Sequence, residues 1–179
     1  MDITFTERVP ELYYEALLEL LVLCDNDFLP PLSARTGTTQ KSFASGGDNA
    51  AKPVAYCREI MAQPGFLVTE NGRLAALLSF RKNYTCSAIA EDTFPNAYIS
   101  TIVVHPDFRG RGIAKQLYHA LMETYPKDRI FTRTWSTNAS QMNILPKMQF
   151  CELERIPNDR GDGIDTVYFC REPQQKGME

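Results

Sequence analysis

The stretch that decides the fold is residues 102–115, which reads Ile102-Val103-Val104-His105-Pro106-Asp107-Phe108-Arg109-Gly110-Arg111-Gly112-Ile113-Ala114-Lys115. Its first three residues end a run of β-branched and apolar residues over 97–104, which predicts a central strand buried on both faces. Pro106 ends that strand, and apolar residues at helical spacing predict a helix from about Gly110 to Tyr125. The stretch is therefore expected to form the end of a strand, a glycine-containing turn and the start of a helix.

The turn between this strand and this helix has the chemistry of an anion site. The first backbone N–H groups of a helix have no partner inside the helix, and the helix dipole favours negative charge there. Gly110 and Gly112 let the backbone approach a ligand closely, while Arg109, Arg111 and Lys115 add positive charge. Such a turn can hold a pyrophosphate. The alternative is a tight turn of purely structural purpose, with arginines that face solvent.

Two familiar nucleotide-binding motifs do not fit the turn. A P-loop requires GxxxxGK[ST], which is absent from the chain. A dinucleotide fingerprint requires GxGxxG, and Lys115 stands where the third glycine is needed. A nucleotide-binding oxidoreductase therefore remains only as a third, weaker hypothesis.

Residues 102–114 resemble the acetyl-CoA signature of the GNAT superfamily of N-acetyltransferases, a strand ending in V-x-P followed by R/Q-x-x-G-x-G/A. Arg109, Gly112 and Ala114 fill the fixed places of that signature. Residues 138–150 resemble a second family segment, N-x-x-A-x-x-L-Y-x-K-x-G-F, in which Asn138, Lys147 and Phe150 agree. The order of expected elements is similar to that of the family along almost the whole chain.

The resemblance implies an open, V-shaped sheet and acetyl-CoA as the cofactor. The pantetheine arm would pair, like an added strand, with the backbone groups of Ile102 and Val104, which lie on either side of Val103. Asn138 would contact the pantetheine or help to position the acyl end. The pyrophosphate would be held by amides of the turn, which comprises Arg109, Gly110, Arg111, Gly112, Ile113, Ala114 and Lys115.

The chain departs from the family at its usual tyrosine, the proposed acid for the leaving thiolate. Leu145 stands there, and Pro146 after it is expected to kink or end the helix. A thiol with a pKa of about 8.5 is a tolerable leaving group without help from a tyrosine, whose pKa is about 10. Tyr98 and Ser140 are the candidate catalytic hydroxyls, with Tyr84 as a further one, and each can equally be a core or surface residue.

Four aspartates are candidates for binding the acceptor. Asp25 and Asp27 follow the end of an expected helix, where the dipole disfavours negative charge. The resemblance places that loop, and the loop 158–165 with Asp159 and Asp165, beside the acceptor. These carboxylates could hold a cationic amine, or they could be ordinary turn residues. The loop 158–165 lacks oxygen ligands that a calcium loop needs, so no metal is expected.

Working outward, the pattern predicts one mixed α/β (α+β) domain over residues 1–172, followed by a polar tail over 173–179. An open mixed central sheet of six to seven strands is expected, flanked by helices. The expected strands are 2–7, 66–70, 73–84, 97–104, 130–135, 150–156 and 166–170. The expected helices are 10–24, 53–63, 110–125 and a short one capped by Asn138. Residues 33–52 are expected to form a long loop.

Composition excludes several classes of protein. The net charge of −3 argues against nucleic acid as a partner, since phosphate binding needs a basic surplus. The five cysteines form no CxxC pair, which favours free thiols in a reducing compartment. The N-terminus lacks the pattern of a signal peptide, and no apolar stretch approaches the roughly 20 residues that span a bilayer. We therefore expect a cytoplasmic protein without a membrane partner.

The leading hypothesis is an acetyl-CoA-dependent N-acetyltransferase. It would transfer the acetyl group to a primary amine by direct attack in a ternary complex, because no site for a covalent intermediate is visible. A small-molecule acceptor is expected rather than a protein, and a homodimer is compatible with the resemblance. The alternative is a non-catalytic acyl-CoA-binding sensor module on the same fold, which Leu145 and Pro146 favour.

Overall fold

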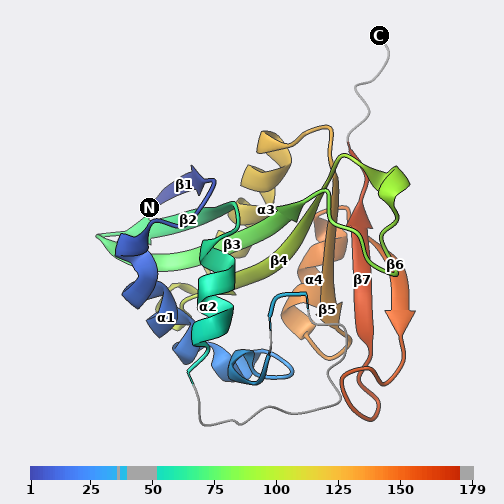
Figure 1. The fold of residues 1–179 in the computed structure, drawn as a ribbon, viewed down its shortest axis with the longest axis horizontal. Helices are drawn as coiled ribbons and strands as arrows, with labels where there is room; N and C mark the ends of the chain where they lie inside the picture. Colours follow the sequence, from blue (N-terminus) through green and yellow to red (C-terminus); the bar gives the residue numbers. More distant parts are fainter. Residues whose placement is uncertain (36, 40–51, 174–179) are drawn as a thin grey trace.

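A computed structural model describes residues 1–35, 37–39 and 52–173. Within these residues, seven strands form one sheet in the order β1-β2-β3-β4-β5-β7-β6 (Figure 1). β4 and β5 pair in parallel and the other neighbours pair antiparallel, so the sheet is mixed, as predicted. The strands are β1 Asp2–Thr6, β2 Gly65–Glu70, β3 Arg73–Lys82, β4 Asn96–Val104, β5 Arg129–Trp135, β6 Cys151–Ile156 and β7 Thr166–Arg171.

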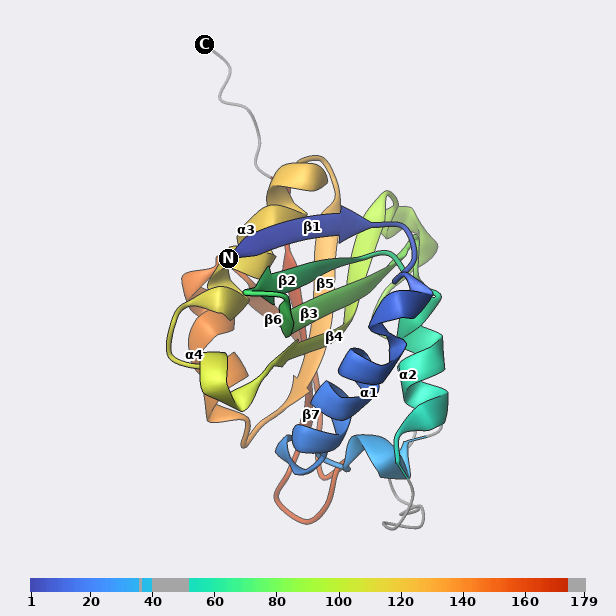
Figure 2. The ribbon, with the colours of Figure 1, turned by 90° about the vertical axis from the view of Figure 1, so that its left-hand side faces the viewer.

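Helices cover both faces of the sheet. α1 and α2 lie on one face and α3 and α4 on the other, which Figure 2 shows with the sheet between the two pairs. The helices are α1 Tyr14–Leu23, α2 Val54–Met61, α3 Ile113–Thr124 and α4 Ala139–Lys147. None of the described helices is long and apolar enough to cross a bilayer.

Each pair of helices buries an apolar core against the sheet. Leu17 and Ile60 belong to the core under α1 and α2, and Leu117 and Leu145 belong to the core under α3 and α4. All four side chains are inaccessible to solvent. Burial of each such side chain stabilises the fold by about 1.5–3 kcal/mol, which fixes the helices on the sheet.

β4 contains an irregularity that lets it contribute to both cores. Ile99 pairs with Phe80 and Thr101 pairs with Ser79, which leaves Ser100 as an extra residue. A bulge of this kind changes which face the following side chains meet. Ile99 lies in the core of α3 and α4, whereas Val103 lies in the core of α1 and α2. The apolar run is therefore buried on both faces, as predicted.

β4 and β5 separate after a short paired segment. Their pairing runs from Asn96 with Arg129 to Ile99 with Thr132, and the rest of the two strands diverges (Figure 1). Since β4 continues to Val104, the sheet opens along the second half of this strand. This split positions the site described below.

Several predicted boundaries differ from the structure. α3 begins at Ile113 rather than near Gly110, because Gly110 and Gly112 both have φ of 75°, outside the helical region. Pro146 was expected to kink or end the helix; it lies inside α4, which ends one residue later at Lys147. In the predicted loop 33–52, Leu32–Ala34 is a 3-10 helix, while residues 36 and 40–51 lie outside the described residues, as do 174–179 of the predicted tail.

Candidate active site

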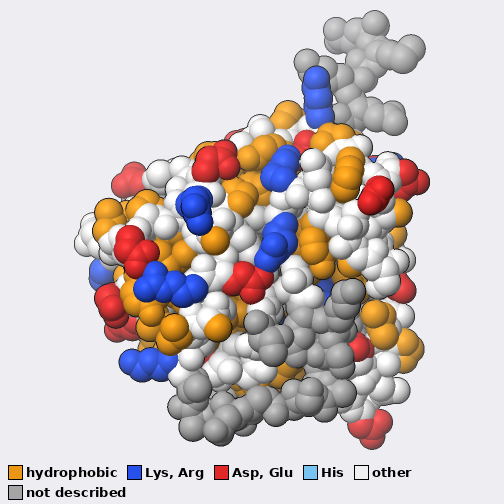
Figure 3. All heavy atoms as spheres, in the orientation of Figure 1, with side chains coloured by type: hydrophobic (Ala, Val, Ile, Leu, Met, Phe, Trp, Pro, Cys, Tyr) orange, Lys and Arg blue, Asp and Glu red, His pale blue; other side chains and the backbone are white. Residues whose placement is uncertain are grey.

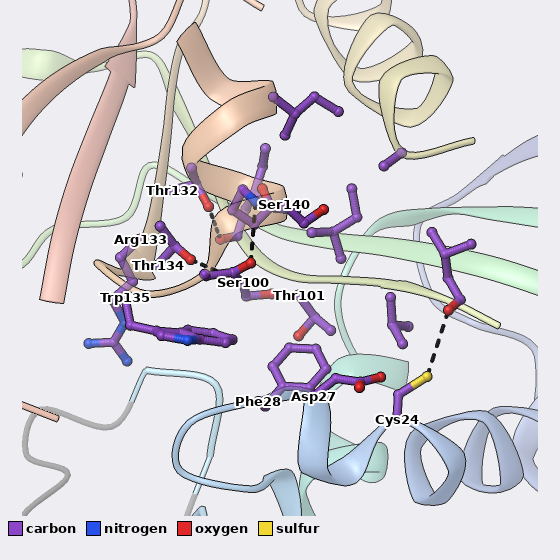
Figure 4. A pocket seen from close by; sticks show the side chains of 18 of the residues that line it. Cys24, Asp27, Phe28, Ser100, Thr101, Thr132, Arg133, Thr134, Trp135 and Ser140 are labelled. Atoms are coloured by element: carbon purple, nitrogen blue, oxygen red, sulfur yellow. Dashed lines mark hydrogen bonds between the residues drawn. The ribbon is translucent and has the colours of Figure 1, made fainter. Parts of the chain in front are cut away.

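A cavity of about 540 Å³ lies in the split between β4 and β5 (Figure 4). Its volume is typical of a pocket for a small molecule or cofactor. The lining comes from β4, β5, the start of α3, the first half of α4, the segment after α1 and the loop between β6 and β7. The lining residues fall into one end near the start of α3 and a second end near Trp135.

The start of α3 forms the first end of the cavity. Gly110, Gly112, Ile113, Ala114 and Lys115 line the cavity. Within the described residues, no backbone carbonyl accepts a hydrogen bond from the N–H groups of Gly110 to Lys115. A Cβ added at Gly110 or Gly112 would meet no atom within 4 Å, so backbone conformation rather than space requires glycine there. The unpaired N–H groups and the helix dipole make this turn an anion site.

Arg109 and Arg111 have different surroundings. Arg109 lines the cavity, and its Nε donates to the Val104 carbonyl at 3.1 Å while its Nη2 lies 2.5 Å from Asp27. Arg111 is not a lining residue, because its guanidinium makes a bidentate pair with Glu70 at 2.6 and 2.7 Å. The hydrogen bonds from Arg111 hold the pKa of Glu70 below its usual value. Arg111 therefore anchors the turn to β2.

The backbone of β4 faces the split at alternate residues. The N–H of His105 donates to the Ala75 carbonyl at 2.8 Å, so the backbone of His105 and Val103 faces β3. Ile102 and Val104 consequently direct their backbone groups to the open edge. The Val104 carbonyl is already engaged by Arg109, while Ile102 lines the cavity without such a contact in the described part of the chain.

The first turn of α4 forms one wall. Asn138 caps this helix, since its Oδ1 accepts from the Gln141 N–H at 3.2 Å and its Nδ2 donates to Thr134 Oγ1 at 3.0 Å. Ser140 follows as an exposed lining residue. Leu145, at the place of the family tyrosine, is completely buried in the core under α3 and α4. No proton donor can come from that position.

Tyr98 lines the cavity and has 2% of its surface exposed. Its ring is 4.5 Å from that of Tyr84. Burial raises the pKa of the Tyr98 phenol above its usual 10. Tyr98 is therefore protonated throughout the physiological range and could donate, but not accept, a proton.

The second end of the cavity combines aromatic and basic side chains. Phe28 and Trp135 have ring centroids 6.2 Å apart and lie opposite Ser100 and Thr101 (Figure 4). Three arginines, Arg35, Arg133 and Arg160, line the same region. Sequence reasoning missed all three, although a basic residue within the apolar strand Ile130–Trp135 was a signal for one of them.

The four candidate aspartates are engaged with other protein groups. Asp25 accepts from the backbone N–H and the hydroxyl of Ser33 at 2.7 and 2.8 Å. Asp159 accepts from the Thr166 hydroxyl at 2.6 Å. Asp165 accepts from the Asn158 N–H and pairs with Arg155, and the two contacts lower its pKa.

Of these four aspartates only Asp27 lines the cavity in the described part of the chain. The described residues hold no group of three or more His, Cys, Asp or Glu side chains arranged for a metal ion. The acidic loops and the cavity are thus largely separate features.

Comparison with known proteins gives one family and one fold. A model of the acetyltransferase (GNAT) family matches residues 39–148. No curated protein sequence matches the chain significantly. Among solved structures, an aminoglycoside 6'-N-acetyltransferase complexed with coenzyme A is similar, with 13% identity and a TM-score of 0.67 over 98% of this chain and 100% of that one.

Two further structures have the same fold. A proposed phosphinothricin N-acetyltransferase has 16% identity and a TM-score of 0.68 over 97% of this chain and 100% of that one. The ribosomal-protein-S18-alanine N-acetyltransferase from Escherichia coli has 13% identity and a TM-score of 0.62 over 99% of both chains. At these identities the likeness establishes the fold and leaves the acceptor open.

Proposed function

Because this chain belongs to the acetyltransferase (GNAT) family, we propose that it transfers an acetyl group from acetyl-CoA to the primary amine of a small molecule, by direct attack in a ternary complex. The observation that carries the proposal is the split between β4 and β5. It has an anion site at one end and an aromatic, basic pocket at the other. One cavity thus offers room for a cofactor and an acceptor together.

The residues at the split fit acetyl-CoA. The N–H groups from Gly110 to Lys115 and the charges of Arg109 and Lys115 suit a pyrophosphate. The open backbone edge at Ile102 suits an amide-containing arm, in the manner of an added strand. Asn138 would stand beside that arm, with its amide held by Gln141 and Thr134.

Acetyl-CoA supplies a thioester carbonyl and a thiolate leaving group. The chain itself offers Tyr98 and Ser140 as hydroxyls that could donate a proton there. Tyr98 is kept neutral by burial, and Ser140 is in the first turn of α4. A positioned proton donor is typically worth about 10²–10⁴-fold in rate. Either hydroxyl could therefore act in place of the family tyrosine, whose position is occupied by Leu145 in this chain.

The acceptor must be neutral to attack, and an alkyl ammonium has a pKa near 10.4. Asp27 is the carboxylate that lines the cavity in the described part of the chain, and its pairing with Arg109 leaves it poorly placed to take that proton. The positive charges of Arg35, Arg133 and Arg160 disfavour a nearby ammonium. They would lower the pKa of a bound amine, so that its proton can pass to water.

The first test is thermal stabilisation of the purified protein by acetyl-CoA, CoA and NAD, followed by CoA release with a panel of primary amines. A ligand at 100 times its dissociation constant should stabilise the fold by about 2.7 kcal/mol. We expect saturable stabilisation by both CoA species, lost in Arg109→Ala and retained in Arg129→Ala, since Arg129 pairs with Glu172 outside the cavity. Absence of stabilisation by either CoA species would overturn the proposal.

A second candidate function is a non-catalytic acyl-CoA sensor. The observation that favours it is the buried Leu145, which removes the hydroxyl of the family tyrosine. In that case CoA would stabilise the protein, yet no amine would accelerate CoA release above the rate without an acceptor. Turnover with any amine of the panel would exclude the sensor.

A further inference from the structure

The charged side chains of the cavity differ from those of the whole protein. The chain has 22 acidic and 19 basic residues, and the face seen in Figure 3 carries both kinds interspersed. Among the described residues, in contrast, the cavity is lined by one carboxylate and five basic side chains. The carboxylate is Asp27, and the basic residues are Arg35, Arg109, Lys115, Arg133 and Arg160. An acidic protein has thus gathered positive charge in one pocket.

A CoA cofactor explains only part of this charge. Arg109 and Lys115 belong to the turn at the start of α3, where phosphates would bind. Arg35, Arg133 and Arg160 instead lie with Phe28 and Trp135 at the second end. The guanidinium carbon of Arg35 is 5.3 Å from the Phe28 ring centroid, and that of Arg160 is 5.4 Å from the Trp135 ring centroid.

These three arginines, which we call the arginine cluster, converge from separate segments. Arg35 follows the 3-10 helix Leu32–Ala34, Arg133 is in β5, and Arg160 is in the β6–β7 loop. Arg35 and Arg160 donate to the same carbonyl oxygen, that of Leu29. Arg160 also donates to Thr166 at 2.9 Å, and Arg133 donates to the Tyr168 hydroxyl at 3.4 Å. The protein holds the cluster in place with these contacts.

Keeping the cluster together costs free energy. Arg160 is only 9% exposed, and burial followed by the positive charges of Arg35 and Arg133 lowers its pKa to about 9. The carboxylate of Asp159, which also accepts from Thr166, acts in the opposite direction. Like charges held close in a partly buried pocket are relieved by an anion.

We propose that the acceptor carries an anionic group beside its amine, as an amino acid does, and that the arginine cluster binds this group. Arginine presents a planar fork of donors that matches a carboxylate. The inference rests on the proposed function, since it assigns the second end of the cavity to the acceptor. It also replaces the expectation that acidic loops select a cationic amine, because Asp25, Asp159 and Asp165 lie outside the lining.

The test compares amino acids with their α-amides as acceptors, at saturating acetyl-CoA, with spermidine as a cationic acceptor. We expect kcat/KM for at least one amino acid to exceed that of its amide by tenfold or more. This preference is opposite to the intrinsic reactivity of the two acceptors. A carboxylate favours the charged ammonium form of the neighbouring amine, which cannot attack, whereas an amide does not. Binding of the same pairs to the CoA complex, measured by calorimetry, should show the same order.

Two variants of one residue test the cluster directly. Arg133→Met should reduce the preference for the acid over the amide at least tenfold, and Arg133→Lys should retain part of it. Arg129→Met is the matched control, since it removes the same charge from the same strand at an exposed pair with Glu172. CoA binding should be unchanged in all three variants.

Each outcome decides the proposal. Amides or spermidine that react or bind as well as the acids would overturn it, and so would a panel in which no amino acid reacts or binds. In both cases retained CoA binding and turnover of another amine would leave the proposed function standing. If the unaltered protein does not bind CoA, the proposed function is overturned, and the inference about the acceptor with it.

Discussion

Nη2 of Arg109 lies 2.5 Å from Oδ2 of Asp27, which joins the turn before α3 to the segment after α1. The two side chains are 46% and 49% exposed, so the pair contributes less than about 1 kcal/mol to stability. Its importance is electrostatic, because it places a carboxylate beside an anion site. The end of the cavity at which we propose that phosphate binds thus contains a carboxylate beside its arginine.

Replacing this carboxylate should strengthen cofactor binding. We expect Asp27→Asn to lower the Kd for CoA by up to about fivefold at low salt, with the gain shrinking as ionic strength rises. Isothermal titration calorimetry at two salt concentrations measures both effects. Asp25→Asn is the control, since Asp25 binds Ser33 outside the lining. Binding weakened more than tenfold would instead show that Asp27 is needed to position Arg109.

The left-handed turn makes Gly112 sensitive to substitution. Gly112→Ala should destabilise the fold by about 1–2 kcal/mol because φ is 75°. The added Cβ would meet no atom within 4 Å, so no steric clash adds to this cost. The substitution should also weaken CoA binding by shifting the start of α3. Gly72→Ala is the matched control, with φ of 77° and equal space in a hairpin outside the cavity. If both variants lost CoA affinity as well as Tm, the result would contradict a role of the turn at Gly112 in CoA binding.

The cap at Asn138 can be separated from any contact with the cofactor. Asn138→Ala should destabilise the protein by about 0.5–2 kcal/mol, because the Gln141 N–H loses its acceptor. Asn138→Asp keeps the cap and should retain most of the stability. If Asn138 also contacts the cofactor through its amide, Asn138→Asp should still weaken CoA binding. Urea denaturation and calorimetry on the two variants distinguish the roles, and equal destabilisation by both would argue against capping.

Restoring the family tyrosine should not improve catalysis. Leu145 is completely buried, so Leu145→Tyr should overpack the core and destabilise it by about 1–3 kcal/mol without raising kcat. Leu145→Met, which nearly conserves volume, should cost less than about 1.5 kcal/mol. Denaturation curves and steady-state kinetics on both variants provide the measurement. A higher kcat for Leu145→Tyr would mean that this position reaches the leaving thiolate.

Alkaline pH should destabilise the protein through Cys57. Burial raises the pKa of this thiol from 9.0 to about 11, so the unfolded chain releases the proton at lower pH than the folded one. The stabilisation is complete below pH 9 and is lost as the pH rises from 9 to 11, by up to about 1.4 kcal/mol per pH unit.

Urea denaturation at several pH values between 8 and 11 checks the contribution of Cys57. In Cys57→Ala the free energy of unfolding should fall less steeply with pH than in the unaltered protein, because one fewer proton is released on unfolding. Cys151→Ala, at an exposed cysteine in β6, is the control. Equal slopes for the unaltered protein and Cys57→Ala would refute the contribution of this thiol.

Much of the fold could be predicted because the relevant signals are local. The run over 97–104 specifies a strand, and Asn71-Gly72, which lies between the paired residues Glu70 and Arg73, specifies a hairpin; both signals come from neighbouring residues alone. The exact start of α3 was missed because Gly110 and Gly112, on either side of Arg111, allow left-handed conformations that composition does not specify. The bulge at Ser100 was missed for a related reason, since it depends on pairing with β3 rather than on the residues of β4.

The amino-acid sequence alone was enough to predict the family, the mixed sheet and the glycine-containing turn before α3. Each follows from local residue patterns and from the order of those patterns along the chain. Only the tertiary structure decided which charges meet in the cavity. The cavity brings together Arg35, Arg133 and Arg160 from distant segments. They meet because β4 and β5 diverge and residues after α1 and after β6 line the space between them. Electrostatic interaction depends on distance in space, which folding sets and linear order does not.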